Sequence, residues 1–323
     1  MKAITYQRYG APEVLEFQEV DEPVVHDDDV LVRVRAASAN PRDWHFMRGL
    51  PAFMRLQFGL RQPKNSGLGS DVAGQVEAVG RNVTRFRPGD EVYADVVQGG
   101  FAEYTSVPEA FLALKPANLT FEQAAAVPLA ALTALQGLRD RGRVRPGQQV
   151  LVVGAAGGVG SFAVQLAKWL GAEVTGVCST RNLDLVRSLG ADHVIDYTRE
   201  DFTRGGRRYD LILQLAGTGS PADCRRALTP SGTLLLSSGE SAGRWIGPGD
   251  RMIKAAVLSP FVGQRLGAFL AKQSREDLQA VRELIEQGKL SPVIDRTYPL
   301  RETPEAIRHL EQGHARGKIV ITV

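Results

Sequence analysis

The stretch Val150-Leu-Val-Val-Gly-Ala-Ala-Gly-Gly-Val-Gly160 gives the clearest fold signal in this 323-residue chain. Residues 149–153 are rich in valine, which predicts a buried strand of a parallel sheet. Residues 158–170 predict an apolar helix that begins directly after the glycines. In this arrangement the free N–H groups and the positive dipole end of the helix face the turn, where an anion such as a phosphate can bind.

The small residues of this turn follow the pattern A-x-G-x-x-G, with Ala155 first, Gly157 second and Gly160 third. In dinucleotide-binding folds the first position makes the turn, the second lets the backbone approach the pyrophosphate, and the third lets helix and strand pack closely. A plain tight turn is the alternative, which the flanking strand and helix disfavour. We therefore expect the pyrophosphate to bind the backbone of Ala156, Gly157, Gly158, Val159 and Gly160.

Strands and helices alternate along the chain around this turn. The predicted strands cover residues 149–153, 173–177, 194–195, 209–213 and 233–237, and the predicted helices cover 158–170, 181–189 and 221–228. An alanine-rich helix over 121–138, with Thr120 as its N-cap, precedes the first strand. Alternation at this spacing predicts an α/β domain, in which helices cover both faces of a doubly wound parallel sheet.

The residues before this α/β part predict a β-rich domain that extends to about Pro116. Valine-rich or alternating runs predict strands at 30–35, 72–79, 91–95 and 102–107, separated by turn sequences. Towards the other end of the chain, residues 274–287 predict a helix with Ser274 as N-cap and Gly288 just beyond its end. The last run, 318–323, predicts a strand that needs a partner.

The residues after the predicted strand 173–177 indicate which dinucleotide binds. An NAD site usually has Asp or Glu about 20 residues beyond the glycines to bind the ribose 2′-hydroxyl. This chain has Cys178-Ser-Thr-Arg-Asn182 there, so Ser179 and Asn182 can donate to a 2′-phosphate and Arg181 can pair with it. A solvated Arg181 is the alternative, although a cation at a helix N-terminus is unfavourable without an anion. We predict NADPH/NADP as the cofactor, in preference to NADH.

Composition excludes several other classes of protein. The 39 Lys and Arg against 36 Asp and Glu leave a net charge of +3, too small a surplus for nucleic-acid binding. The only two cysteines, Cys178 and Cys224, exclude a disulfide framework and a cysteine-rich zinc site. The first residues lack an apolar signal segment, and the longest apolar stretch, 124–135, is shorter than the roughly 18 residues of a membrane span. We expect a cytoplasmic protein without stable membrane association.

Seven ordered motifs resemble the medium-chain dehydrogenase/reductase superfamily, in its zinc-free NADPH:quinone oxidoreductase branch, nearly from end to end of the chain. The motifs are Ala36-Ala-Ser-Ala-Asn-Pro-Arg-Asp43, Gly69-Ser-Asp-Val-Ala-Gly74, Arg87-Pro-Gly-Asp-Glu-Val92, Gly99-Gly-Phe-Ala-Glu-Tyr104, Ala156-Gly-Gly-Val-Gly160, Leu189-Gly-Ala-Asp192 and Arg316-Gly-Lys-Ile-Val320. The resemblance implies a GroES-like catalytic domain, 1–120 and 270–323, around an inserted Rossmann NADP-binding domain, 121–269. The cofactor would then lie in the cleft between the two domains.

The same resemblance bears on the chemistry. Zinc-dependent alcohol dehydrogenases of the superfamily have Cys where this chain has Asn40, and a His-Glu pair where it has Ser70-Asp71, so no catalytic zinc site is expected. The implied reaction is hydride transfer from NADPH to a quinone or an α,β-unsaturated carbonyl (enone or enal), because such acceptors spread the incoming charge without a Lewis acid. An NADPH-binding sensor or structural protein without turnover is the alternative. RNA binding, known in some members, finds no aromatic-basic pattern here.

The resemblance places the catalytic residues in the segment that starts at Asn40. It assigns Asn40 to orientation and polarisation near the nicotinamide ribose and the substrate oxygen, with a turn residue before Pro41 as the alternative. It matches Asp43 to an acidic residue of the family, for which helix capping is the alternative. Trp44 is expected to line the substrate pocket, and His45 either donates a proton or lies at the surface.

Further cofactor contacts follow from the resemblance. Tyr197 would lie beside the adenosine 2′-phosphate, with an ordinary half-buried aromatic as the alternative. Lys318 would lie near the cofactor, with a plain edge-strand charge as the alternative. The residues that end the next two strands would border the nicotinamide half; they are Leu215, Ala216, Gly217, Ser237, Ser238 and Gly239.

Segment 47–64 mixes apolar residues with Arg48, Arg55 and Arg61. A lid over a bulky, apolar small-molecule substrate, a core-packed helix and a membrane-surface contact are three interpretations that the sequence leaves open. The resemblance also implies a homodimer, formed through edge-strand pairing near residues 233–237.

Overall fold

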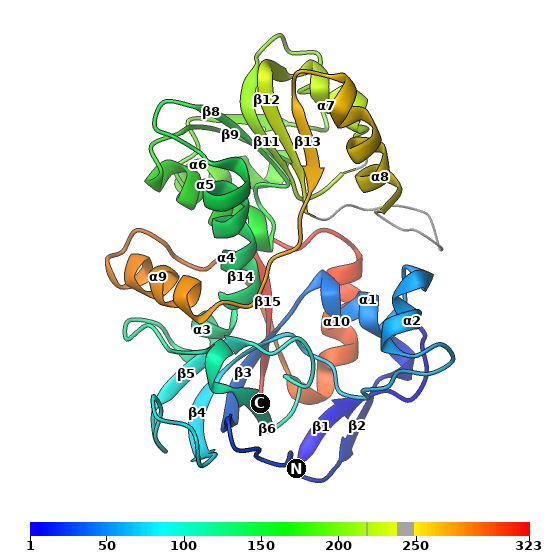
Figure 1. Ribbon diagram of the computed structural model, residues 1–323, viewed down its shortest axis with the longest axis vertical. Coiled ribbons are helices and arrows are strands. Elements are labelled where there is room, and N and C mark those ends of the chain that lie inside the picture. The colour runs from blue at the N-terminus through cyan, green and yellow to red at the C-terminus, as the bar shows by residue number, and fades with distance from the viewer. Residues whose placement is uncertain (218, 238–248) are drawn as a thin grey trace. The chain divides into compact units, whose positions relative to one another are not determined.

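The computed structural model describes residues 1–217, 219–237 and 249–323, which form two compact units (Figure 1). The first unit contains Met1–Leu132 and Gln273–Val323, and the second contains Thr133–Lys272. Two segments from opposite ends of the chain therefore fold together around an inserted unit. In the described ranges no helix combines the length and the apolarity that crossing a bilayer requires.

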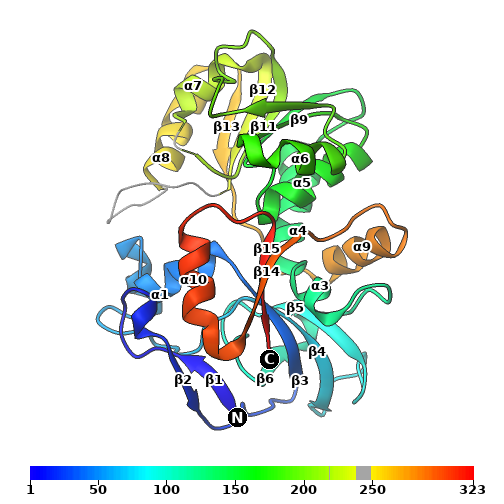
Figure 2. The ribbon, with the colours of Figure 1, turned by 180° about the vertical axis from the view of Figure 1, so that it is seen from behind.

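The second unit is a six-stranded parallel sheet with the strand order β10-β9-β8-β11-β12-β13. The chain runs outward from β8 to β10 and then from β11 to β13, so the strand order reverses between β8 and β11. Figures 1 and 2 show α5 and α6 on one side of the sheet and α7 and α8 on the other. The predicted doubly wound α/β domain is confirmed. Its strands are β8 (Gln149–Val153), β9 (Glu173–Cys178), β10 (His193–Asp196), β11 (Tyr209–Gln214), β12 (Leu228–Leu236) and β13 (Arg265–Ala268), and its helices are α5 (Gly158–Trp169), α6 (Leu183–Ser188), α7 (Pro221–Arg226) and α8 (Gly249–Leu258).

The predicted dimer edge near residues 233–237 is wrong. Thr233 to Leu236 of β12 pair with Arg265 to Ala268 of β13, so β12 is an inner strand. The sequence Arg-Leu-Gly-Ala of β13 is too short and too poor in β-branched residues to be recognised as a strand. The homodimer itself stays a prediction.

The first unit is a mainly antiparallel sheet with the order β14-β15-β3-β4-β5-β7, and β6 pairs with β3. The predicted C-terminal strand finds its partner here, because Ile319 of β15 pairs with Ala39 of β3. A second, two-stranded sheet joins β1 (Lys2–Thr5) to β2 (Glu16–Glu19). The other elements are β3 (Asp29–Ala39), β4 (Asp71–Val79), β5 (Glu91–Asp95), β6 (Tyr104–Pro108), β7 (Leu112–Leu114), β14 (Ile294–Pro299), β15 (Lys318–Thr322), α1 (Pro41–Arg48), α2 (Arg55–Phe58), α9 (Arg275–Glu286) and α10 (Thr303–Glu311).

The long helix predicted over 121–138 is divided. α3 (Phe121–Ala125) is capped by Thr120, whose hydroxyl accepts from the Gln123 amide at 3.3 Å, as predicted. α4 (Pro128–Leu135) then starts anew, because Pro128 has no N–H to continue the ladder of α3, and a π-helical turn follows at Gln136–Gly142. α3 packs on β3, β4 and β15, so residues 121–132 belong to the first unit, whereas 121 was the predicted start of the inserted domain.

Candidate active site

The phosphate loop between β8 and α5 has its turn one residue earlier than predicted. Gly154 has φ +87°, a conformation that favours glycine, whereas Ala155 is buried and its amide donates to the Val177 carbonyl at 3.0 Å. A Cβ on Gly160 would lie 2.0 Å from the Gly154 carbonyl oxygen, so only glycine fits where helix and turn meet. The functional spacing is therefore Gly154, Gly157, Gly160, which explains why alanine is tolerated at 155.

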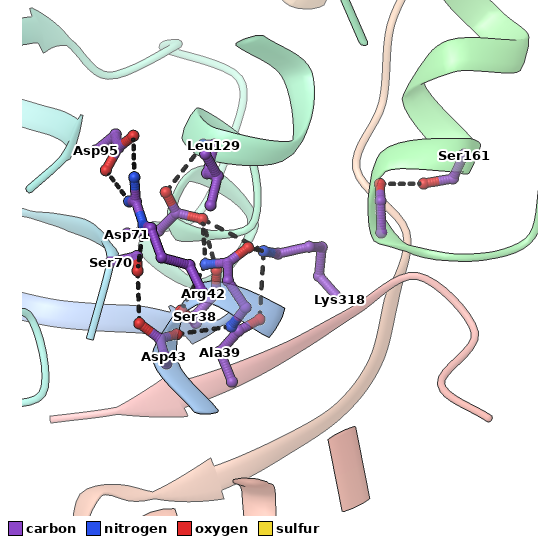
Figure 3. A network of polar contacts seen from close by, with 12 residues as sticks. Ser38, Ala39, Arg42, Asp43, Ser70, Asp71, Asp95, Leu129, Ser161 and Lys318 are labelled. Carbon is purple, nitrogen blue, oxygen red and sulfur yellow. Dashed lines mark hydrogen bonds and ion pairs between the residues drawn. The ribbon is translucent and has the colours of Figure 1, made fainter. Parts of the chain in front are cut away.

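This loop fits a dinucleotide pyrophosphate. Gly157 is the extended N-cap of α5, and Gly158, Val159 and Gly160 form the first turn, whose amide groups have no acceptors within the helix. Of the atoms that the structure describes, a Cβ on Gly157 would meet only the Gly154 oxygen, at 3.4 Å, so these residues leave the backbone open to close approach. Figure 3 shows Ser161 turned back onto the Gly158 carbonyl, to which its hydroxyl donates at 3.0 Å.

The carboxyl ends of β9 and β10 bring together the residues predicted to hold the 2′-phosphate. The amide of Tyr197 donates to the Cys178 carbonyl at 3.1 Å, which places Tyr197 beside Ser179. Tyr197 is 58% exposed, and Arg181 is also exposed. Asn182 is buried and donates to the Ser179 hydroxyl at 3.2 Å, so its amide positions Ser179 instead of lying open to a ligand.

Sequence reasoning missed Asp196, which ends β10 in the same place. Its carboxylate accepts from the hydroxyl of Thr180 and from both the amide and the hydroxyl of Thr198, the last two at 3.0 and 2.7 Å. The Thr180 hydrogen bond in particular lowers the pKa of Asp196. This carboxylate links the turns after β9 and β10, and the only sequence signal for it was its position directly before Tyr197.

The turn after β11 lies beside the phosphate loop, and Ser237, just after β12, bonds to the end of β11. The Leu215 amide donates to the Val153 carbonyl at 3.1 Å, and the Ala216 side chain would be 2.8 Å from a Cβ on Gly154. Gly217 has φ +81°, and the Ser237 amide donates to the Gln214 carbonyl at 3.2 Å. These residues therefore share the carboxyl edge of the sheet, whereas Ser238 and Gly239 lie outside the described residues.

In the first unit, Asn40 joins a buried polar cluster (Figure 3). Its side-chain nitrogen donates to Asp71 at 2.9 Å and to the Ser38 carbonyl at 3.2 Å, and its oxygen accepts from the Lys318 ammonium. Asn40 and Lys318 are each 3% exposed and Asp71 is fully buried. Both donor hydrogens of the Asn40 amide are thus engaged within the protein, which leaves no donor for a substrate oxygen.

Asp71 is the centre of this cluster. It accepts hydrogen bonds from the Ser38 hydroxyl at 3.1 Å and from the Leu129 amide, in the first turn of α4, at 2.9 Å. It also pairs with Lys318 at 3.3 Å. The Lys318 ammonium reaches the Ala39 carbonyl as well, at 3.4 Å, so its hydrogens are directed inward and the predicted cofactor contact of Lys318 is not open in this unit. The cluster ties β3, β4, β15 and α4 together.

Asp43 caps helix α1, which was the alternative interpretation of this residue. One carboxylate oxygen accepts from the Asn40 amide at 2.7 Å and the other from the Ser70 hydroxyl, while Asp43 is fully buried. Burial raises its pKa to about 7, although these hydrogen bonds act in the opposite direction. The neighbouring Arg42 donates to Ser70 at 3.0 Å and forms an ion pair with Asp95. Both carboxylate oxygens of Asp43 are therefore engaged within the protein.

Trp44 and His45 stack on each other with ring centroids 3.8 Å apart. Both are half-buried, so His45 does not lie on the open surface. His45 Nδ1 lies 2.8 Å from the Leu50 carbonyl, which can only accept, so Nδ1 carries the hydrogen. Burial lowers the pKa of His45, which makes the neutral ring with an accepting Nε2 the form at neutral pH. Neutral His45 has no further proton to donate.

Part of segment 47–64 packs in the core, whereas the lid and the membrane-surface contact stay predictions. Met47 is fully buried, and Phe58 packs on Phe46 with ring centroids 4.8 Å apart. The side chains that remain outside the core are Phe53, Leu56 and Leu60, which are 55%, 74% and 67% exposed. The segment is therefore anchored in the core while it presents an apolar surface.

Known proteins resemble this chain over nearly its whole length. Residues 26–117 match the family model "Alcohol dehydrogenase GroES-like domain", and 189–321 match "Zinc-binding dehydrogenase". A 2-methylene-furan-3-one reductase from Solanum lycopersicum is 37% identical over 99% of this chain and 79% of its own length. A chloroplastic NADPH-dependent alkenal/one oxidoreductase from Arabidopsis thaliana is 36% identical with the same coverage. The solved quinone oxidoreductase from Coxiella burnetii superimposes with a TM-score of 0.86 at 31% identity, covering 100% and 99% of the two chains.

The glycine loop, the fold and these relatives define an NAD(P)H-dependent oxidoreductase that binds NADP(H) and acts on a small molecule. The chain belongs to the medium-chain dehydrogenase/reductase superfamily, in its quinone oxidoreductase-like branch. An oxidoreductase agrees with the predicted enzyme and not with the alternative of a binding protein without turnover. The chloroplastic relative leaves the cytoplasmic location as an expectation.

Proposed function

We propose that the protein transfers hydride from NADPH to a quinone or an α,β-unsaturated carbonyl without zinc. The observation that carries this proposal is the buried cluster at the positions where zinc-dependent members have their ligands. Asn40 offers an amide and Ser70 a hydroxyl in place of a thiolate and an imidazole, and the Asp71 carboxylate already holds the Lys318 ammonium. In the described residues no group of three or more His, Cys, Asp or Glu could hold a metal ion. The matched "Zinc-binding dehydrogenase" model begins at residue 189, beyond these positions.

Without a Lewis acid, the acceptor itself has to accommodate the negative charge of the transferred hydride. A conjugated acceptor does so, because hydride attack on its β-carbon moves the electron pair through the alkene to the carbonyl oxygen, and water then protonates the α-carbon. NADPH supplies the hydride from C4 when it is bound. The printed activities of the tomato and Arabidopsis relatives, a 2-methylene-furan-3-one reductase and an alkenal/one oxidoreductase, support this class of acceptor.

The residues of this chain then bind and orient, with no side chain assigned as the proton donor. The first turn of α5 would bind the pyrophosphate, and Ser179, Arg181 and Tyr197 would bind the adenosine 2′-phosphate. Asn40 and Asp43 would fix the backbone where β3 passes into α1. Since His45 is neutral and its Nδ1 hydrogen is engaged by Leu50, water is the proton source that fits.

The exposed apolar side chains of segment 47–64 support a bulky, apolar acceptor. Phe53, Leu56 and Leu60 would cover such a substrate, since an exposed apolar group of this kind is typical of ligand or partner contact. A triple serine variant at these positions is expected to raise the KM of a long-chain enone several-fold and to leave that of a short enone unchanged. Serine in place of the exposed Phe261 of the second unit serves as the control.

Loss of reduced-nicotinamide absorbance across a panel of acceptors tests the proposed function. We expect turnover with quinones, enones and enals, and none with the saturated ketones and aldehydes of the same carbon skeletons. Turnover with saturated carbonyls alone would overturn the proposal.

A further inference from the structure

Arg251 is a buried cation whose guanidinium donates hydrogen bonds to backbone carbonyls at the carboxyl edge of the parallel sheet, where the cofactor would bind. It lies in the first turn of α8 and is only 7% exposed. Its two terminal nitrogens donate to the carbonyls of Gly217 and Gly219, at 2.7 and 2.6 Å. Among the described residues the neighbouring Asp250 pairs with Lys254, no carboxylate forms an ion pair with Arg251, and the Arg251 Nε has no acceptor.

Two features of the described surroundings disfavour an arginine at this position. Burial of a guanidinium without a carboxylate is costly, and an apolar side chain of similar length would fill the space without that cost. A cation in the first turn of a helix also opposes the helix dipole. A residue that is unfavourable on both counts points to a role in the site that it contacts.

The two carbonyls belong to the turn after β11, next to the phosphate loop. Gly217 has φ +81°, and among the described residues no atom lies within 4 Å of a Cβ placed there. Ala216, directly before it, would be 2.8 Å from a Cβ on Gly154. A glycine backbone with this freedom needs an external restraint to keep one conformation. The two terminal nitrogens of Arg251, here called the Arg251 fork, supply two directional hydrogen bonds.

We propose that Arg251 is a positioning residue for the nicotinamide half of the cofactor, which acts by fixing the backbone at Gly217 and Gly219. The inference rests on the proposed function and on the sequence-based expectation that the residues ending β11, Leu215 to Gly217, border the nicotinamide half. Arg251 should therefore affect the nicotinamide half of the cofactor alone, because residues at the ends of β9 and β10 would bind the adenosine half. Loss of the Arg251 fork therefore weakens binding at one end only.

Titration of three variants with two ligands tests this separation. Arg251→Met removes the fork, Arg251→Lys keeps the charge without the paired geometry, and Arg225→Met removes an exposed arginine of α7 as the matched control. The ligands are NADPH and adenosine 2′,5′-bisphosphate, which lacks the nicotinamide half. We expect Arg251→Met to keep the melting temperature and the bisphosphate affinity of the wild type, and to lose about tenfold or more in NADPH affinity together with a lower kcat. Arg251→Lys recovers part of both, and Arg225→Met behaves as wild type.

Equal losses for the two ligands, or no loss for NADPH, would overturn the positioning role. If Arg251→Met does not fold, Arg251→Lys decides by the same comparison, since it too should lose NADPH affinity and keep bisphosphate affinity. A wild-type protein that binds neither ligand would instead refute the proposed function, so the two failures are distinguishable.

Discussion

Polar residues of the buried cluster in the first unit are enclosed, whereas those at the cofactor edge of the second unit are exposed. The cofactor edge consists of the first turn of α5 and the residues that follow β9 and β10. Asn40 and Lys318 are each 3% exposed and direct their hydrogen bonds inward to Asp71. At the cofactor edge Tyr197 is 58% exposed, Arg181 is exposed, and the first turn of α5 has amides without acceptors in the helix. The difference teaches that burial commits the polar groups of the cluster to one another, whereas Tyr197 and the first turn of α5 are accessible to a ligand.

The largest effect on cofactor affinity is expected where the edge depends on the absence of a side chain. Gly160→Ala places a Cβ 2.0 Å from the Gly154 oxygen, so the phosphate loop has to move and NADPH affinity should fall at least about 100-fold. Fluorescence titration measures this loss. Gly267→Ala, in β13 of the same unit, is the control because no atom lies within 4 Å of its new Cβ. Wild-type NADPH affinity of Gly160→Ala would contradict the binding of NADPH at the phosphate loop.

Substitutions in the buried cluster should change the free energy of unfolding. Asp71→Asn leaves the buried Lys318 ammonium without its carboxylate and should lower the free energy of unfolding by about 3–5 kcal/mol. Denaturant unfolding measures this change. The double variant Asp71→Asn with Lys318→Met removes both charges and should recover a large part of it. Additive losses in the double variant would show that the two side chains do not act as a pair.

The pH dependence of stability tests the cap beside the cluster. The folded-state pKa of Asp43, about 7, exceeds the ordinary value of 3.8, so between these pH values only the folded state keeps the proton. The contribution of Asp43 to the free energy of unfolding should therefore be largest below about pH 4 and decline, by at most about 4 kcal/mol, as pH rises to about 7. Asp43→Asn should reduce the decline, and the residual slope reports other groups, such as Asp95, whose pKa burial also raises. An unchanged slope would contradict the raised pKa.

The smallest effect concerns the choice of cofactor at the edge. Arg181→Met should weaken NADPH by about 10- to 100-fold and leave NADH nearly unchanged, since a hydrogen bond to a charged group contributes roughly 1.5–3 kcal/mol. Parallel titrations with both cofactors measure the ratio. Arg187→Met, at an exposed arginine paired with Asp184, is the control. Equal losses for NADPH and NADH would place Arg181 away from the 2′-phosphate.

The sequence predicted the parts of this molecule that depend on local pattern. The strand Gln149–Val153 and the caps at Thr120 and Ser274 follow from short-range chemistry, and the structure has them as predicted. Pro128 breaks the helix predicted over 121–138, a signal that was present in the sequence but outweighed by the alanine-rich pattern.

The roles of polar side chains could not be predicted in the same way. Whether the Asn40 amide is free depends on Asp71 and Lys318, which are 31 and 278 residues away along the chain. A similar dependence hid the bond from Thr180 to Asp196 and those from Arg251 to Gly217 and Gly219, because these partners become neighbours only in the folded second unit. Residue type and position indicated the sites, but only the completed hydrogen-bond network shows which groups remain open.

The destination of a labelled hydride tests the account most directly. Protein treated with a chelator and shown to contain no zinc is supplied with C4-deuterated NADPH and an enone, and the product is analysed by NMR. If hydride is transferred to the β-carbon without zinc, the product is a saturated ketone with one deuterium at the β-carbon and a solvent proton at the α-carbon. Deuterium at the carbonyl carbon of an alcohol product, or turnover only after zinc is restored, would contradict it.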